Sequence, residues 1–243
     1  LLMYLFAFVA IDAVSAIVIY FMTYYLGRGN ETNYVLGALL LAQIVALPLF
    51  VKLSGRVGKR RGFVVAIVFW VVVQGWSFLI SPDSPNFVIY LFGGLVGIGT
   101  GGVVIMIYSI FPDVPDIDEL FSRERREGVY SGLYTFMRKL SSAFGIFAIS
   151  NIIQLSGYRA PIEQIVNGEL VSVEQVQSDG FVLALRVVFV VIPLILLSLG
   201  VWQSLKYPLT PELHARLKAV LEKRRAGEPD EAAEADVAAA LRM

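Results

Sequence analysis

The stretch FVIYLFGGLVGIGTGGVVIMIYSIFPDVPDIDELFSRERREG, residues 87–128, joins two segments of opposite character. Its first 24 residues contain no charged side chain, and about 20 apolar residues in a helix cross the roughly 30 Å hydrocarbon core of a bilayer. The remainder begins with Pro112 and Pro115, continues with several carboxylates and ends with three arginines among residues 123–126. We therefore predict a membrane span that ends at the prolines, followed by a charged segment outside the bilayer.

The composition extends this interpretation to the whole chain. Hydrophobic residues make up 57% of the 243 and charged residues 16%, and the mean hydropathy is +0.70, whereas soluble domains are about 45–50% apolar and about 25% charged. The formal net charge is zero and there is no cysteine. We expect a membrane protein without a nucleic-acid partner, a disulfide framework or thiol chemistry, and the bacterial inner membrane fits this composition.

Six segments are long and apolar enough to span a bilayer as helices, so the predicted fold is an all-α membrane protein. The predicted spans are Leu1–Leu26, Tyr34–Val51, Phe63–Ile80, Phe87–Ile110, Val129–Ile153 and Phe181–Leu205. We interpret the glycines of residues 93–102 as sites of close helix packing rather than as a phosphate-binding loop. Residues 1–207 form the transmembrane unit of this prediction, and residues 208–243 form a tail.

The distribution of lysine and arginine predicts the orientation. Residues 52–61 carry five basic side chains, residues 111–128 carry three and the segment after Leu205 carries seven, but the alternate loops contain only Arg28 and Arg159. By the positive-inside rule the basic loops and both chain ends are cytoplasmic. Leu1 is already apolar and follows no basic region, so we expect the first span to be a mature helix with a further segment before it.

Two segments outside the spans carry local signals. Ser172 and Gln175 have the spacing of a capping box, which predicts a short surface helix in the outer loop at 154–180. In the tail, Thr210 and Pro211 are typical of a helix start, and the leucines at 213, 217 and 221 form one stripe. We expect this helix to lie along the inner membrane surface and the residues after 227 to be loosely ordered.

Two ionisable residues fall deep inside predicted spans. Lys139 is about 15 Å beyond Val129 and Asp12 reaches a similar depth in the first span, both near the midplane. Charge there is expensive, which indicates a partner or a water-filled cavity. The alternative is that Lys139 and Arg138 extend to the membrane surface and that Asp12 bonds a neighbouring helix. Gln43 and Gln74 are expected to make interhelical hydrogen bonds.

Thr135 and Lys139 are four residues apart and share a helix face, with Tyr134 one position round. An ammonium, a hydroxyl and an aromatic ring suit a hydroxyl-rich ligand such as a sugar. Such residues are also common packing material in membrane helices.

The segment FPDVPDIDELFSRERREGVYSGLYTFMRKLSSAFG, together with GYRAP, ALRVVF and YPLTPELHARL, closely resembles the second half of the glycoside-pentoside-hexuronide:cation symporters, the melibiose-permease-like branch of the major facilitator superfamily. The resemblance implies that the six spans are helices seven to twelve of a twelve-helix carrier. It also implies substrate-site roles for Lys139 and Thr135, with Asp12 as a possible partner of Lys139. For the aromatic residue that the family places near the sugar, residues 103–109 offer only Tyr108.

The same resemblance implies what lies outside the chain. The cation-binding acids and the main sugar-binding aspartates of the family belong to its first six helices, so the coupling ion, Na⁺, Li⁺ or H⁺, would bind mainly there. No other cofactor is expected. The implied partners are a sugar, membrane lipid and an N-terminal six-helix half, in the same chain or separate. The superfamily's loop motif Gly-x-x-x-Asp-Arg-x-Gly-Arg-Arg survives only as Arg56, Gly58, Lys59 and Arg60.

For the charged segment we predict a gating role, in which its carboxylates pair with arginines of the loop or of the other half. A few exposed pairs of about 0–1 kcal/mol each are enough to bias a two-state equilibrium. The alternative is a solvated anchor. The predicted gating residues are Asp113, Asp118, Glu119, Arg125, Arg126 and Glu127.

Three other functions stay open at this stage. Asp113, Asp116 and Asp118 resemble a carboxylate cluster for Mg²⁺, as in membrane prenyltransferases, but no second cluster follows and no HExxH or GxSxG occurs. We therefore do not expect an enzyme. A half-length membrane protein that binds a partner without transport is possible, and so is a lysolipid substrate.

Overall fold

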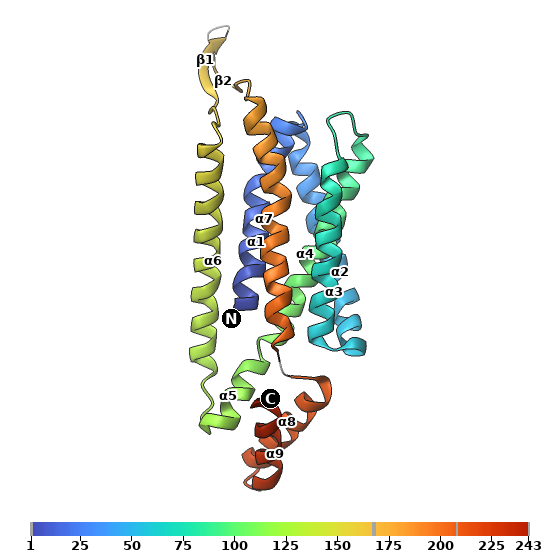
Figure 1. Ribbon diagram of the computed structural model, residues 1–243, viewed down its shortest axis with the longest axis vertical. Coiled ribbons are helices and arrows are strands. Elements are labelled where there is room, and N and C mark those ends of the chain that lie inside the picture. The colour runs from blue at the N-terminus through green and yellow to red at the C-terminus, as the bar shows by residue number, and fades with distance from the viewer. Residues whose placement is uncertain (1, 167–168, 208, 243) are drawn as a thin grey trace.

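The computed structural model describes residues 2–166, 169–207 and 209–242. Within these residues six long helices run side by side, with a β-hairpin at one end and a group of shorter helices at the other (Figure 1). The long helices are α1 (Leu2–Tyr20), α2 (Thr32–Val57), α3 (Lys59–Trp76), α4 (Asn86–Ile110), α6 (Glu127–Leu155) and α7 (Asp179–Leu205). The remaining elements are the π-helical turn Phe21–Tyr25, the 3₁₀ turns Gly29–Glu31 and Ser77–Leu79, α5 (Asp113–Ser122), α8 (Pro211–Arg225), α9 (Glu231–Arg242) and the strands β1 (Ile162–Val166) and β2 (Glu169–Val173).

The all-α membrane architecture predicted from composition is confirmed. Five of the long helices in the described part of the chain are long and apolar enough to cross a membrane: α1, α2, α3, α4 and α7. The remaining predicted span, Val129–Ile153, lies in α6, which is helical over 29 residues but is less apolar, because it carries Arg138 and Lys139 together with several glycines and serines. We call the end of the bundle that holds the α2–α3 turn, α5, α8 and α9 the basic end, and the opposite end the hairpin end (Figure 1).

The glycines of α4 let it pack closely between α2 and α3. Gly93, Gly97 and Gly101 are four residues apart and therefore share one face, which meets the backbone of α2. A Cβ atom at residue 97 would lie 3.0 Å from Leu39 Cα, and one at residue 101 would lie 2.9 Å from the carbonyl oxygen of Gln43. The prediction of tight glycine packing is confirmed, since no larger side chain fits between these backbones.

A buried glutamine joins α3 to α7. Gln74 is fully buried, and its Nε2 donates to the carbonyl oxygen of Phe189 at 2.7 Å. That carbonyl has no partner of its own in α7 because Pro193, four residues later, has no N–H. Gln74 thus makes the predicted interhelical bond, whereas the side chain of Gln43 packs beside Gly101.

The outer loop contains a β-hairpin, so the short helix predicted from Ser172 and Gln175 is wrong. β1 and β2 pair antiparallel, with Glu163 opposite Ser172. Both strands are rich in β-branched residues, and the sequence Asn-Gly at 167–168 is a common hairpin signal. Residues 167 and 168 themselves lie outside the described residues. The strand pattern outweighs a capping box because the polar pair is not followed by an apolar helical stripe.

The tail forms a compact group of helices at the basic end. α8 begins as predicted, with the Thr210 side chain accepting a hydrogen bond from the Leu213 N–H at 3.2 Å. Its leucine stripe packs against Leu120 of α5 and Val237 of α9. The leucine stripe of α8 is therefore covered by protein, and its position relative to the membrane stays a prediction. The expectation that residues after 227 are loosely ordered is wrong, because α9 packs its apolar face on α8.

Candidate functional site

The centre of the bundle holds a charge pair between α1 and α6. Arg138 donates to both carboxylate oxygens of Asp12, at 2.6 and 3.0 Å. The Asp12 side chain is only 12% exposed and that of Arg138 is 36% exposed. The guanidinium also lies over the ring of Phe8, 4.6 Å from its centroid. The two charges therefore neutralise each other at the contact between α1 and α6.

Aromatic rings extend this pair toward the basic end. Tyr134 is buried and its ring centroid is 4.0 Å from that of Tyr4, 4.2 Å from that of Phe111 and 5.8 Å from that of Tyr108. α1, α4 and α6 each contribute to this cluster, in which aromatic rings fill the space between the helices. Tyr134 and Tyr108 thus lie in one aromatic cluster, in which the Tyr134 ring is packed between rings of α1 and α4.

Lys139 and Thr135 lie on a different face of α6. Both side chains are exposed, and the Thr135 hydroxyl donates to the carbonyl of Ser131, one turn earlier in its own helix, at 2.9 Å. The predicted pairing of Lys139 with Asp12 is wrong. Successive helical residues point about 100° apart, so Arg138 reaches α1 and Lys139 points away from it. Lys139 and Thr135 therefore stay together, separate from Asp12, Tyr108 and Tyr134.

A second polar centre surrounds Asp113 at the basic end. This carboxylate is 2% exposed and accepts two hydrogen bonds from Lys59 Nζ, at 2.6 and 2.8 Å, and one from the Tyr207 hydroxyl at 2.9 Å. His214 Nε2 is 3.2 Å from the same carboxylate, yet it makes no hydrogen bond with any group in the described part of the chain. Asp113 thus joins α3, α5 and the start of the tail.

Burial determines how the neighbours of Asp113 titrate. It lowers the pKa of His214, against the opposing pull of Asp113, and nearby Lys59 and Lys218 lower it further. It also raises the pKa of Tyr207, and the adjacent carboxylate adds to this effect. At neutral pH the imidazole is therefore uncharged and the phenol stays protonated, so Lys59 is the cation that balances Asp113.

The other predicted gating residues form ion pairs near this centre. Glu119 accepts from Arg225 of α8, with 3.0 Å between Nε and Oε1. Asp118 accepts two bonds from Arg126, at 3.1 and 3.0 Å. Arg125 donates to Glu127 at 2.8 Å. The pairs Arg126–Asp118 and Arg125–Glu127 show the predicted pairing of carboxylates with arginines of the loop. The pairs of Asp113 with α3 and of Glu119 with α8 also hold α5 in place.

Metal chemistry finds no support in the charged segment. Among the described residues, no group of three or more His, Asp or Glu side chains could hold a metal ion. Asp113, Asp116 and Asp118 each face a basic side chain instead, respectively Lys59, Arg225 and Arg126. The Mg²⁺ cluster considered for an enzyme is therefore not formed.

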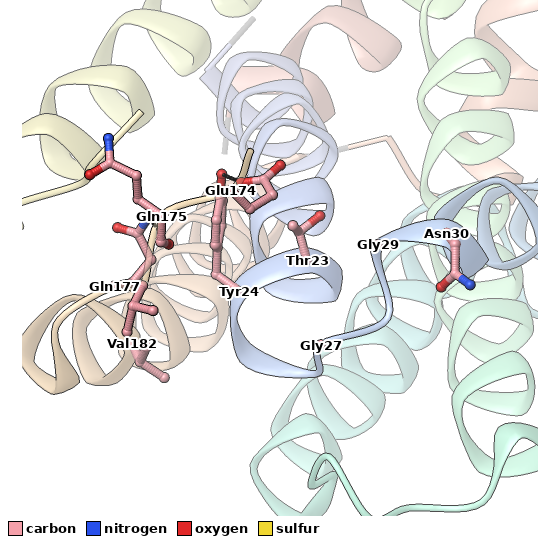
Figure 2. Close-up of a pocket in the computed structure, with 10 residues that line it drawn as sticks. Thr23, Tyr24, Gly27, Gly29, Asn30, Glu174, Gln175, Gln177 and Val182 are labelled. Atoms are coloured by element: carbon pink, nitrogen blue, oxygen red, sulfur yellow. Dashed lines mark hydrogen bonds between the residues drawn. The ribbon is translucent and has the colours of Figure 1, made fainter. Parts of the chain in front are cut away.

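The hairpin end has an open pocket of about 790 Å³ (Figure 2). Thr23 and Tyr24 come from the π-helical turn that follows α1, and Gln175 and Gln177 come from the segment between β2 and α7. Tyr24 donates to Glu174 and its hydroxyl is 2.9 Å from that of Tyr158. Half of the ten described residues that line it carry neutral hydrogen-bonding side chains, a pattern that suits a polar solute. π-Helical turns often occur at functional sites.

With this geometry in place, comparison with known proteins identifies the family. Residues 1–211 match the family described as MFS/sugar transport protein. The chain belongs to this family. The melibiose-permease-like branch inferred from the charged segment and the Thr-x-x-x-Lys pair is confirmed.

Relatives of this MFS chain are symporters and carriers. It is 24% identical over 226 residues to an uncharacterized symporter of Synechocystis sp., covering 91% of this chain and 40% of that protein. It is 25% identical over 226 residues to the glucuronide carrier protein homolog of Escherichia coli, covering 88% and 44%. It is 23% identical over 194 residues to the sodium-dependent lysophosphatidylcholine symporter 1-A of Danio rerio, covering 79% and 34%. The chain therefore spans less than half the length of each.

Several contacts of this MFS chain had no signal in the sequence. Lys59, Tyr207 and Arg225 are far in sequence from the carboxylates they hold, and no local spacing links them. The choice between Arg138 and Lys139 had no signal either. Arg138 is seven residues before Gly145, which packs on Asp12, but Lys139 is likewise seven residues after Gly132, so the spacing of small residues in α6 does not tell which cation reaches α1.

Proposed function

We propose that this chain is part of a secondary transporter that moves a sugar, such as a glycoside, pentoside or hexuronide, together with a cation by alternating access. The observation that carries the proposal is the outward face of α6. Lys139 lies about 18 Å along this helix from Glu127 at 1.5 Å per residue, near the middle of its length. A lysine exposed at that depth is costly in lipid, which favours a water-filled path or a partner in front of it.

In the proposed transporter the six long helices form the C-terminal half. An N-terminal six-helix half, in the same chain or separate, covers the Thr135 and Lys139 face and supplies most ligands for the coupling ion, Na⁺, Li⁺ or H⁺. The two side chains then line the path, where Lys139 donates to substrate oxygens. Asp12 acts through Arg138 by holding α6 against α1, so it is a positioning residue.

The experiment is uptake of labelled melibiose and a labelled glucuronide by cells that express the transporter containing this chain, in Na⁺, Li⁺ or H⁺ gradients. We expect Lys139→Met to lower accumulation by at least about tenfold, and Thr135→Val by less, at unchanged protein amount. Lys52→Met removes an exposed lysine of α2 away from this face and serves as the control. Wild-type accumulation by Lys139→Met would overturn the proposed site.

A lysolipid is the second candidate substrate. Phe136 and Leu140, next to Thr135 and Lys139, are 59% and 44% exposed, so the face combines one cation with apolar surface. A zwitterionic headgroup and an acyl chain would suit that combination. Uptake of labelled lysophosphatidylcholine in the same assay distinguishes a lysolipid substrate from a sugar. If neither class is transported, the result supports the alternative of a membrane protein that binds a partner without transport.

For the topology we propose a multi-pass protein of the bacterial inner membrane with the basic end in the cytoplasm. The lysines and arginines of α3, of residues 123–126 after α5 and of α8 then lie on the positive-inside side. A cysteine placed at Arg159 should react with an impermeant maleimide in intact cells, and one placed at Lys59 should react only after permeabilisation. The reverse result would invert the proposed orientation.

A further inference from the structure

The basic end contains a cavity that includes the predicted gating residue Asp113 but lies apart from the Thr135 and Lys139 face proposed for the substrate. It has a volume of about 720 Å³ and lies between the α2–α3 turn and the start of α8. Among the described residues that line it are Arg56, Lys59, Arg60, Arg61, Asp113 and Glu212. Four cations thus face two carboxylates.

The pairing of these charges leaves the cavity cationic. Asp113 is already held by Lys59 and Tyr207. Arg56, Arg60 and Arg61 form no ion pair with any carboxylate in the described part of the chain, and Arg60 contacts only a backbone oxygen, that of Tyr207, at 3.4 Å. Among the described residues that line the cavity, Glu212 is then the one carboxylate left to offset the charge of these three arginines, and it forms no ion pair with them.

The backbone adds to the positive potential. α3 starts at Lys59, and its N-cap, Gly58, provides no side chain to cap the first turn. The first N–H groups of a helix have no intrahelical acceptor, and the helix dipole makes its start favourable for anions. The first turn also carries three basic side chains, whose positive charge is unfavourable beside the positive end of the dipole. An anion bound there would accept hydrogen bonds from the N–H groups and would reduce this repulsion.

Two further features define the cavity. Gly58 has φ +86°, and a Cβ atom there would lie 2.9 Å from Pro211 Cγ, so the α2–α3 turn holds the start of α8 closely as one wall. His214 lines the cavity, and its buried Nε2 has no hydrogen-bond partner among the described residues.

We propose that this cavity binds a phosphate group. Arginine pairs with phosphate through two parallel hydrogen bonds, and the three arginines with the free N–H groups of α3 match its several oxygens. The phosphate can belong to an anionic lipid headgroup or to a soluble phosphate ester. Leu49 and Val51, 60% and 54% exposed, precede the first lining residue of α2, Ser54, in the same helix. A bilayer that covers these apolar side chains would place the cavity near its headgroups.

The test uses the transporter that contains this chain, purified in dodecyl maltoside. Native mass spectrometry measures binding of phosphatidylglycerol against phosphatidylcholine, and calorimetry measures binding of glycerol 3-phosphate. The variant is Arg56→Gln with Arg61→Gln, two exposed side chains without ion pairs. The control is Lys52→Gln with Arg216→Gln, which removes the same charge from exposed positions that do not line the cavity.

We expect the cavity variant to bind phosphatidylglycerol at least about tenfold more weakly, or ~1.4 kcal/mol, and the control to bind as the unchanged protein does. Tight binding of glycerol 3-phosphate with the same dependence on Arg56 and Arg61 would support the site with a soluble ligand. Equal weakening in variant and control would overturn the proposal, because the basic end would then attract anions only through its total charge. Absence of phosphate binding would also overturn it. Arg61→Gln alone should show a smaller loss of the same kind, and neither assay depends on a transported substrate.

Discussion

α4 and α6 are both long helices, but they differ in how much of their surface this chain covers. α4 lies between α2 and α3, and its glycines meet their backbones and side chains. α6 contacts α1 along one face, and its opposite face exposes Thr135, Lys139 and large apolar residues. The comparison teaches that most of the middle of α4 is packed within the chain, although Phe87 and Tyr108 near its ends are exposed, whereas the outward face of α6 is left for lipid, water or a partner to cover.

The largest expected effect comes from filling the α2–α4 contact. Gly97→Ala would place a methyl group against the backbone of Leu39, and backbone atoms cannot rotate away. We expect destabilisation by about 3 kcal/mol or more, measured as thermal unfolding in detergent, because overpacking costs about 1–3 kcal/mol even where side chains give way. Gly94→Ala is the matched control, since its Cβ would meet only Ala42 Cβ at 3.9 Å. Equal stability of the two variants would contradict the close packing of α4.

The next effect comes from breaking the pair that holds α6 to α1. Arg138→Gln leaves Asp12 buried and unpaired, and we expect it to cost about 2–3 kcal/mol, below the 3–5 kcal/mol of fully buried pairs because Arg138 is partly exposed. The double variant with Asp12→Asn should be more stable than Arg138→Gln alone, as a double-mutant cycle of thermal unfolding would show. Lys139→Gln should leave stability unchanged. If it destabilised the protein as much as Arg138→Gln, the two faces of α6 would not differ.

The smallest effect repeats the glycine test on α6. A Cβ atom at residue 145 would lie 3.2 Å from Asp12 Cβ, a contact that a shift of a few tenths of an ångström relieves. We expect Gly145→Ala to cost about 1 kcal/mol or less, well under the cost of Gly97→Ala. Gly132→Ala, with nothing within 4 Å, should be neutral or slightly stabilising because alanine favours a helix. A loss from Gly145→Ala as large as from Gly97→Ala would show that α6 packs as tightly as α4.

Much of this architecture could be predicted before the structure was known. Hydropathy located the long helices, since each must bury or expose to lipid about 20 apolar residues. Thr210 and Pro211 predicted the start of α8 from local capping alone. The outer loop was mispredicted because a capping box is a two-residue signal, whereas the β-branched runs at 162–166 and 169–173 act through pairing with each other.

The site was predicted less well, for a reason that the two cations of α6 illustrate. Sequence reasoning found charge at mid-depth in α1 and α6, but it assigned Asp12 to Lys139. Neighbouring positions on a helix have the same depth and differ only in direction. The direction of each depends on which helix packs against α6, and no spacing within one helix contains that information.

Sequence by itself determined the membrane class, the long helices and the close packing of the glycine helix, because each follows from residue type and local period. Only the tertiary structure decided that Asp12 belongs to Arg138, that Asp113 belongs to Lys59 and Tyr207, and that the tail folds onto α5 as α8 and α9. These contacts join residues far apart in the chain. The packing of the helices determines which partners meet. In α6, the turn of about 100° between neighbouring residues separates Arg138, which pairs with Asp12, from the exposed Lys139.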